Sequence, residues 1–214
     1  MKEQNSFTLM QPKLPKALNT VQPAETINDD DSYSGCLFEH CRFSGKARRL
    51  NINFSVLRGV RFEGVLPAAQ LDDVLFDGCD FSNADFSDTM LLRVEFKNCR
   101  MTGVNFSGAV LKDIKLEDCS AKYANFHFSR FERVVFSSCN CSDADFGEAA
   151  FNMVKFEQSI LVQAQMSGTS LSGIDLTSCE IDGLGARPQD LRGVVLTSNQ
   201  AVTAAKIIGA IIKG

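Results

Sequence analysis

Residues 71–106 read LDDVLFDGCD FSNADFSDTM LLRVEFKNCR MTGVNF, and every fifth residue of this stretch is apolar. The series starts at Leu71 and keeps its register to Leu196, and none of its twenty-six members is charged. A second series, two residues earlier in each pentad, is mostly small or β-branched, and Gln189 alone breaks it. A period of five fits neither an α-helix nor a flat strand, so the repeat predicts a different architecture.

A second period of twenty residues lies on top of the first. Similar residues recur at every fourth pentad, as in Cys79, Cys99, Cys119 and Cys139. A twenty-residue coil has four sides, and equivalent side chains of successive coils stack at about 4.8 Å. We therefore expect an all-β fold, a right-handed quadrilateral β-helix, with a dry core in which Phe86, Phe106, Phe126 and Phe146 form one stack.

The register also divides the chain into segments. Residues 1–31, with three prolines and an acidic run, predict an extended tail that covers the first coil, and residues 32–197 predict the solenoid. Upstream of Leu71 two intervals between core residues are nine instead of ten, which predicts small irregularities or loops at Gly45–Arg49 and Val65–Gln70. Thr197 and Gln200 fit a capping box that opens a short α-helix within residues 198–214, compatible with 201–212.

The predicted C-terminal helix is apolar on nearly every side. Such a helix must be buried on more than one side, and the last coil can cover only one of them. A homodimer related by a twofold axis is the simplest closed solution. The expected interface residues are Leu191, Val194, Leu196, Val202, Ile207, Ile208, Ile211 and Ile212.

Composition narrows the class of protein. The net charge of −4 argues against a nucleic-acid binder, and no basic segment followed by an apolar one marks export, so we expect a cytoplasmic protein without membrane contact. His40 and His127 are isolated, and no GxSxG, HExxH or phosphate-binding loop is present, so we expect neither catalysis nor a cofactor. The cysteines follow the core period and are interpreted as small hydrophobic residues. A redox or metal enzyme that uses these cysteines is a further functional hypothesis, and it ranks third after the two given below.

Charge is more informative when it is sorted by side. Residues 71–196 contain 19 acidic and 11 basic residues, a net charge of −8. Phe128 sits at an outward position among the acids, and an exposed aromatic beside carboxylates is typical of an interface, although net charge also serves solubility. The side centred on Phe86 contributes Asp85, Asp88, Phe128, Asp145 and Glu148 to the predicted partner-binding acidic face, and the side centred on Phe76 adds Asp77, Glu117 and Asp118.

The pentads at 84–88 (ADFSD) and 144–148 (ADFGE) match the tandem A(D/N)(L/F)xx units of pentapeptide-repeat proteins, and the chain resembles that family over about 33–196. The stretch 111–126 and the ending at 190–193 resemble the chromosomal Qnr-type quinolone-resistance proteins of Gram-positive bacteria. That resemblance implies a dimeric rod that imitates duplex DNA, binds DNA gyrase or topoisomerase IV and lowers their inhibition by fluoroquinolones. The alternative is a non-catalytic interaction scaffold with an unknown partner.

Duplex DNA bounds how far such imitation can go. The twenty-six pentads correspond to a rod of roughly 31 Å, and duplex DNA of that length carries about 18 charges. The net charge of −8 is less than half of this, so we expect one-sided imitation.

Overall fold

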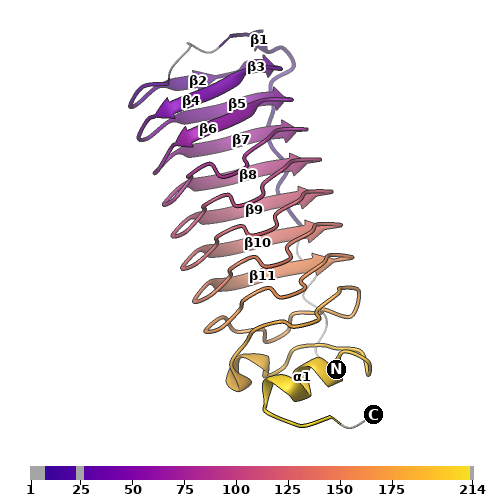
Figure 1. The fold of residues 1–214 in the computed structure, drawn as a ribbon. Coiled ribbons are helices and arrows are strands. Elements are labelled where there is room, and N and C mark those ends of the chain that lie inside the picture. The colour runs from indigo at the N-terminus through magenta and orange to yellow at the C-terminus, as the bar shows by residue number, and fades with distance from the viewer. Residues whose placement is uncertain (1–7, 23–26, 213–214) are drawn as a thin grey trace.

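The computed structural model describes residues 8–22 and 27–212, and these form a parallel β-solenoid (Figure 1). Five equivalent strands pair with a constant offset of twenty residues, as in Leu71↔Leu91 and Leu91↔Leu111. They are β7 (Gln70–Asp77), β8 (Met90–Lys97), β9 (Val110–Glu117), β10 (Arg130–Ser137) and β11 (Ala150–Glu157). The predicted quadrilateral β-helix with a short C-terminal helix is confirmed.

The coils nearer the N-terminus are one residue shorter. Their strands are β1 (Asn19–Thr20), β2 (Ser32–Ser34), β3 (Cys36–Glu39), β4 (Arg42–Lys46), β5 (Asn51–Arg58) and β6 (Arg61–Val65). Leu37 pairs with Val56 and Asn51 with Gln70, an offset of nineteen.

Of the small irregularities or loops predicted at Gly45–Arg49 and Val65–Gln70, the structure has the irregularity: the missing residue is absorbed at the strand pair β4–β6, without a longer loop. One inward residue, Ala47 or Leu66, takes the place of two on that side. Gly64 has to be glycine there, since a Cβ would collide with the carbonyl oxygen of Gly45.

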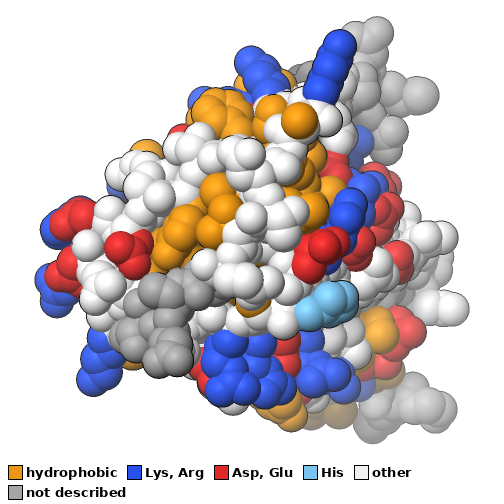
Figure 2. Space-filling model, turned by 90° about the horizontal axis from the view of Figure 1, so that it is seen from above, with side chains coloured by type: hydrophobic (Ala, Val, Ile, Leu, Met, Phe, Trp, Pro, Cys, Tyr) orange, Lys and Arg blue, Asp and Glu red, His pale blue; other side chains and the backbone are white. Residues whose placement is uncertain are grey.

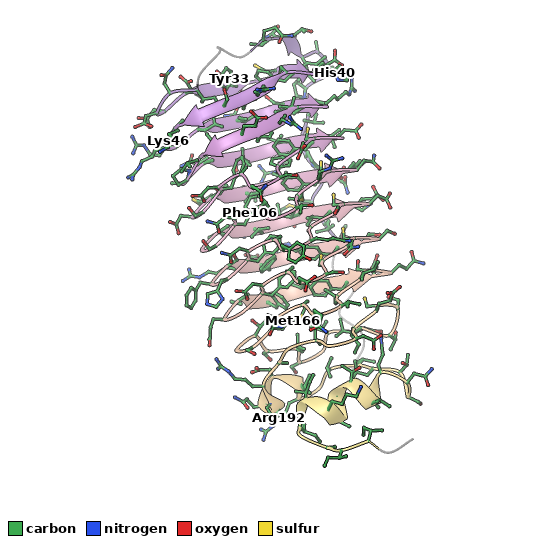
Figure 3. All side chains as sticks on the ribbon, in the orientation of Figure 1. Tyr33, His40, Lys46, Phe106, Met166 and Arg192 are labelled. Carbon is green, nitrogen blue, oxygen red and sulfur yellow. The ribbon has the colours of Figure 1, made fainter. Side chains whose placement is uncertain are left out.

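The interior is a column of stacked side chains. Phe106 and Phe126 have ring centroids 5.8 Å apart with planes 6° from parallel, and Phe126 and Phe146 are 5.0 Å apart at 10°. Phe86 continues the stack, so the predicted aromatic column is confirmed. Phe106 lies inside the rod at mid-height (Figure 3), and in the view from the β1 end apolar side chains gather centrally while charged ones occupy the rim (Figure 2).

In the coils between Leu71 and Gly173 each pentad ends in a corner whose residue has a positive φ. Asp73, Gly78, Asn83 and Asp88 mark the four corners of one coil, with φ between 55° and 62°. Glycine, asparagine and aspartate tolerate this region best. We name the four sides of the rod the Leu71, Phe76, Phe81 and Phe86 sides after the inward residue that heads each column. The Phe76 and Phe86 sides lie two corners apart and therefore face in opposite directions.

The N-terminal tail does more than cover the first coil. β1 pairs with β3 at that end and Ile27 is buried, whereas residues 8–18 run along the rod (Figure 1). We call residues 8–22 the strap; residues 1–7 and 23–26 lie outside the described part of the chain. Half-buried Leu9, Leu14 and Leu18 lie along it.

Main-chain hydrogen bonds hold the strap to two buried carboxylates. The Lys13 N–H donates to Asp73 at 2.8 Å and the Met10 N–H to Asp113 at 3.3 Å. Asp73 and Asp113 are two coils apart, about 9.6 Å, which is close to the reach of three extended residues. Both are corner residues of the Leu71 side, yet they are only 1% and 2% exposed.

Each of these carboxylates also receives a bidentate arginine. Arg93 donates to Asp73 at 2.6 and 2.7 Å, and Arg133 donates to Asp113 at 2.7 and 2.8 Å. Burial alone raises the pKa of Asp73 and of Asp113, but the hydrogen bonds and charges of the arginines and the strap N–H groups outweigh it, and each pKa lies below 3.8. The two aspartates are therefore ionised partners in a buried network.

The C-terminal end closes the solenoid. A 3₁₀-helix, η1 (Pro188–Leu191), explains why Gln189 breaks the second apolar series. The helix α1 spans Ala201–Ile207 and is shorter than the expected 201–212, because Gly209 adopts a φ of 85° just after it. Thr197 and Gln200 exchange the two predicted capping hydrogen bonds, and Gln200 also donates to the Leu176 and Cys179 carbonyls of the last coils. No helix among the described residues is long and apolar enough to cross a membrane.

Replacing one inward and one outward phenylalanine of the same coil tests the core. Phe126→Ala leaves a cavity in the aromatic stack and should lower the free energy of unfolding by about 3–5 kcal/mol. Phe128→Ala, two residues on and exposed, should change it by less than about 0.5 kcal/mol. Urea unfolding followed by circular dichroism measures both, and equal losses would contradict a dry stacked interior.

Acid unfolding tests the strap carboxylates. A carboxyl group with a lowered pKa in the folded state adds stability above its unfolded pKa, near 4, and that stability is lost as the pH falls through the folded value. The variant Asp73→Asn with Asp113→Asn should be less stable at pH 7 and should lose less stability between pH 5 and pH 3. Urea midpoints across this range give the slope, and an unchanged slope would show that these carboxylates are not involved.

Candidate partner-binding surface

The residues of the predicted acidic face lie on two opposite sides of the rod. Asp77, Glu117 and Asp118 belong to the Phe76 side. Asp85, Asp88, Phe128, Asp145 and Glu148 belong to the Phe86 side. The eight residues therefore do not form one continuous surface, because pentads ten residues apart point in opposite directions. The two surfaces have to be considered separately.

Ion pairs compensate much of the charge on the Phe76 side. Lys97 contacts Glu95 at 3.1 Å and Lys115 contacts Glu117 at 2.7 Å. The hydrogen bond from Lys115 lowers the pKa of Glu117, and the hydrogen bond to Glu95 raises the pKa of Lys97. In total this side carries six acidic residues and three lysines, a net charge of −3, and the two ion pairs neutralise part of it locally.

The Leu71 and Phe81 sides are also paired. Besides the two buried Asp–Arg pairs, Lys112 on the Leu71 side contacts Glu132 at 3.1 Å. On the Phe81 side Asp80 lies between Arg61 at 3.4 Å and Arg100 at 3.6 Å. Four carboxylates on these two sides thus have basic neighbours in the same or the adjacent coil: Asp73, Asp80, Asp113 and Glu132.

The Phe86 side carries a ladder of turn-forming residues: Asp85, Asn105, Asn125 and Asp145 pair in successive coils. Asp85 accepts the Ser87 N–H at 2.9 Å, and Asp145 accepts the Gly147 N–H at 2.7 Å. Asn105 and Asn125 make the same bond with their side-chain oxygens. Asparagine and aspartate serve this turn equally. The negative charge of Asp85 and Asp145 is therefore not required by the fold.

The corner next to this ladder adds two exposed carboxylates. Its column reads Asp88, Gly108, Phe128, Glu148 and Gly168. Glu148 pairs with Arg187 at 2.6 Å, whereas Asp88 makes no ion pair within the described ranges. Asp88 and Glu148 are three coils apart, about 14 Å. Four carboxylates on this side thus face a single arginine.

Two outward residues that the sequence analysis did not select complete the surface. His127 Nδ1 lies 3.1 Å from Asp145 Oδ2, and its ring meets Phe128 edge to face at 4.2 Å. Tyr123, at the preceding corner, is 62% exposed, and Phe128 is 64% exposed. The positions of His127 and Tyr123 within the pentad already mark both as outward, and that signal could have identified them.

Two family models match this pattern of stacked pentads. One describes a pentapeptide repeat region and matches residues 69–136; the other describes eight copies of the pentapeptide repeat and matches 139–177, and together they span half the chain. The chain belongs to the pentapeptide-repeat family.

Among solved structures, this pentapeptide-repeat protein is similar to a trypsin-treated variant of QnrB1, a plasmid-mediated fluoroquinolone resistance protein. Identity is 19%, coverage is 87% of this chain and 100% of the other, and the TM-score is 0.47. HetL, a pentapeptide-repeat protein involved in the regulation of heterocyst differentiation in the cyanobacterium Nostoc sp. strain PCC 7120, is 12% identical over 81% of this chain and 89% of HetL, with a TM-score of 0.42. No curated protein matches the chain.

The cysteine column of the pentapeptide-repeat rod lies inside. Cys79, Cys99, Cys119 and Cys139 are buried, and the Cys99 and Cys119 thiols each donate to a main-chain carbonyl at 3.3 Å. All eight cysteines are free thiols. Within the described residues no group of three His, Cys, Asp or Glu side chains could hold a metal ion. This placement favours the structural interpretation of the column.

The predicted dimer residues fall into two groups. Leu191, Val194 and Leu196 are half-buried and pack against the core of their own chain, and Ile207 is half-buried as well. Val202, Ile208, Ile211 and Ile212 are exposed, Ile211 at 89%. The apolar surface available at this end therefore lies on α1 and the residues that follow it.

Proposed function

We propose that this protein is a dimeric, non-catalytic DNA mimic that binds a type II topoisomerase, DNA gyrase or topoisomerase IV, and lowers its inhibition by fluoroquinolones. The observation on which the proposal depends is the Phe86 side, where four carboxylates face one arginine and the turns do not require the charge of two of them, Asp85 and Asp145. The choice of a topoisomerase as the partner comes from the sequence resemblance to Qnr-type proteins. The closer resemblance to the Qnr-type proteins of Gram-positive bacteria stays a prediction.

The charge density of the Phe86 side suits one-sided imitation of DNA. From Asp85 to Glu148 the surface spans about three coil spacings, or 14 Å. One strand of duplex DNA presents about four phosphates over that length, and this side presents four carboxylates, one of them offset by Arg187. A protein groove that receives a phosphate strand is lined by basic residues, so the same groove complements this surface.

The alternative, an interaction scaffold for another protein, is favoured by a different feature of the same surface. Phe128 is large, apolar and exposed, and DNA presents no such group on its backbone. Exposed aromatic residues are enriched in protein interfaces. In both hypotheses the Phe86 side is the binding surface, and they differ in the partner.

A supercoiling assay with and without ciprofloxacin tests the partner and the surface. Micromolar protein should change gyrase activity or its drug response. The variant Asp85→Asn, Asp88→Asn, Asp145→Asn and Glu148→Gln removes four charges and keeps the turn acceptors, and should require at least about tenfold more protein for the same effect.

The matched control lies on the opposite side of the rod. Asp77→Asn, Glu117→Gln and Asp118→Asn should leave the effect within about twofold of wild type, because the Phe76 side is expected to face away from the enzyme. A wild-type protein with no effect would reject topoisomerase binding. Equal losses in both variants would reject the Phe86 side as the contact surface.

We also propose that the protein forms a twofold dimer through the exposed apolar residues of the C-terminal end. Ile208→Asp with Ile211→Asp places charge in this interface and should convert a dimer into a monomer in sedimentation equilibrium. Met90→Asp, at an exposed apolar position on the Leu71 side, should leave the dimer intact. A monomeric wild-type protein at micromolar concentration would contradict the dimer.

A further inference from the structure

One coil of the Phe86 side departs from its neighbours at both corners. Tyr123 and Phe128 stand there with φ of 58° and 59°, and both are mostly exposed. The equivalent corner residues of the other coils are Asn83, Gly103, Asp143 and Gln163 in one column and Asp88, Gly108, Glu148 and Gly168 in the other. Aromatic residues are disfavoured in this backbone region, at a cost of order 1–3 kcal/mol each, and exposure returns nothing to folding.

The two corners have the same surroundings. Gly103 precedes Tyr123 by one coil and Asp143 follows it by one coil; Gly108 and Glu148 take the same positions around Phe128. The corner side chain of the preceding coil lies over each glycine, Asn83 over Gly103 and Asp88 over Gly108, so polar oxygen atoms occupy that flank. The acids place a carboxylate about 4.8 Å further along the rod. The arrangement glycine, aromatic, acid is thus present twice across one side.

The space between the corners is also ordered. The Asn125 side chain accepts the His127 N–H at 2.9 Å. His127 lies across Gly147, where a Cβ would come within 2.8 Å of Nδ1, and its ring braces Phe128 edge to face. Asp145 fixes that ring through Nδ1. Phe128 is therefore held in place by its neighbours.

An exposed ring beside a carboxylate complements a planar cation. A guanidinium stacks on an aromatic face and pairs with a carboxylate at its edge, whereas an ammonium is more strongly hydrated and lacks the planar stacking surface. Arg187 already shows that the Glu148 carboxylate accepts a guanidinium.

We propose that Tyr123 and Phe128 form two arginine-binding positions, and that the partner of the Phe86 side presents arginine side chains to them. This inference rests on the proposed function in placing the contact surface on the Phe86 side, but it concerns the chemistry of recognition and its test does not use a topoisomerase.

The test compares labelled octa-arginine and octa-lysine peptides by fluorescence anisotropy with the full-length protein at low salt. Both peptides sense the carboxylates, and only the arginine peptide gains from stacking. The wild-type protein should bind octa-arginine about five- to thirtyfold more tightly than octa-lysine. Equal affinities would overturn the proposal.

Three variants locate the effect. Tyr123→Asn with Phe128→Asn suits the backbone and should reduce the arginine preference to less than about twofold, with octa-lysine binding unchanged. Phe54→Asn, an exposed corner aromatic on the Leu71 side with φ of 49°, should keep the preference. Arg187→Ala frees the Glu148 carboxylate and should strengthen octa-arginine binding. A preference that survives the double variant, or that Phe54→Asn also removes, would overturn the proposal.

The two proposals fail separately. An arginine preference that depends on Tyr123 and Phe128, without any effect on gyrase, supports these positions and rejects the topoisomerase as partner. A gyrase effect that survives the double variant, together with equal affinity for the two peptides, rejects the arginine positions and leaves the proposed function standing.

Discussion

The translation of one coil onto the next, by about 4.8 Å, is the constraint on which this molecule depends. Main-chain bonds such as Phe106 N–H to the Asn125 carbonyl at 2.7 Å repeat from coil to coil and fix it. Each inward side chain then lies over its counterpart, and a stack of rings such as Phe106 on Phe126 follows from the register. The one-residue deficit of the first coils is tolerated because β4 and β6 absorb it together and keep the translation between them.

The same translation explains what could be predicted from sequence. Whether a residue is inward, outward or at a corner depends on its place in the pentad, so the core and the sides were predictable. The closing Thr197–Gln200 contact was predictable from its capping-box spacing. The strap was not, because residues 8–22 have no period. Asp73 and Asp113 occupy outward corners by the repeat, and only the strap and two arginines, neither implied by the period, make them buried. The 3₁₀ turn at Gln189 was visible only as an interruption.

The repeat predicts the compensation of charged residues less completely than it predicts the core. Summing acids over residues 71–196 ignored where their partners lie. Glu117 is compensated by Lys115 two residues away, and Asp113 by Arg133 one coil away. Residues ten apart share a composition and face opposite directions, so Asp77 and Asp88 could not belong to one surface. A sequence gives the side of each carboxylate, but the geometry of the ion pairs determines which carboxylates remain uncompensated.

A rod built by translation makes functional residues easier to recognise than a globular fold does. Every coil meets nearly the same folding requirements, so neighbouring coils serve as internal references for any one position. Asn105 and Asn125 show that the turn at Asp85 and Asp145 does not need a charge. Gly103 and Gly108 show that the corners at Tyr123 and Phe128 do not need an aromatic ring. Both departures lie on the Phe86 side, and because they oppose or ignore local stability, folding does not explain them. They are the features on which the proposed recognition of a basic partner rests.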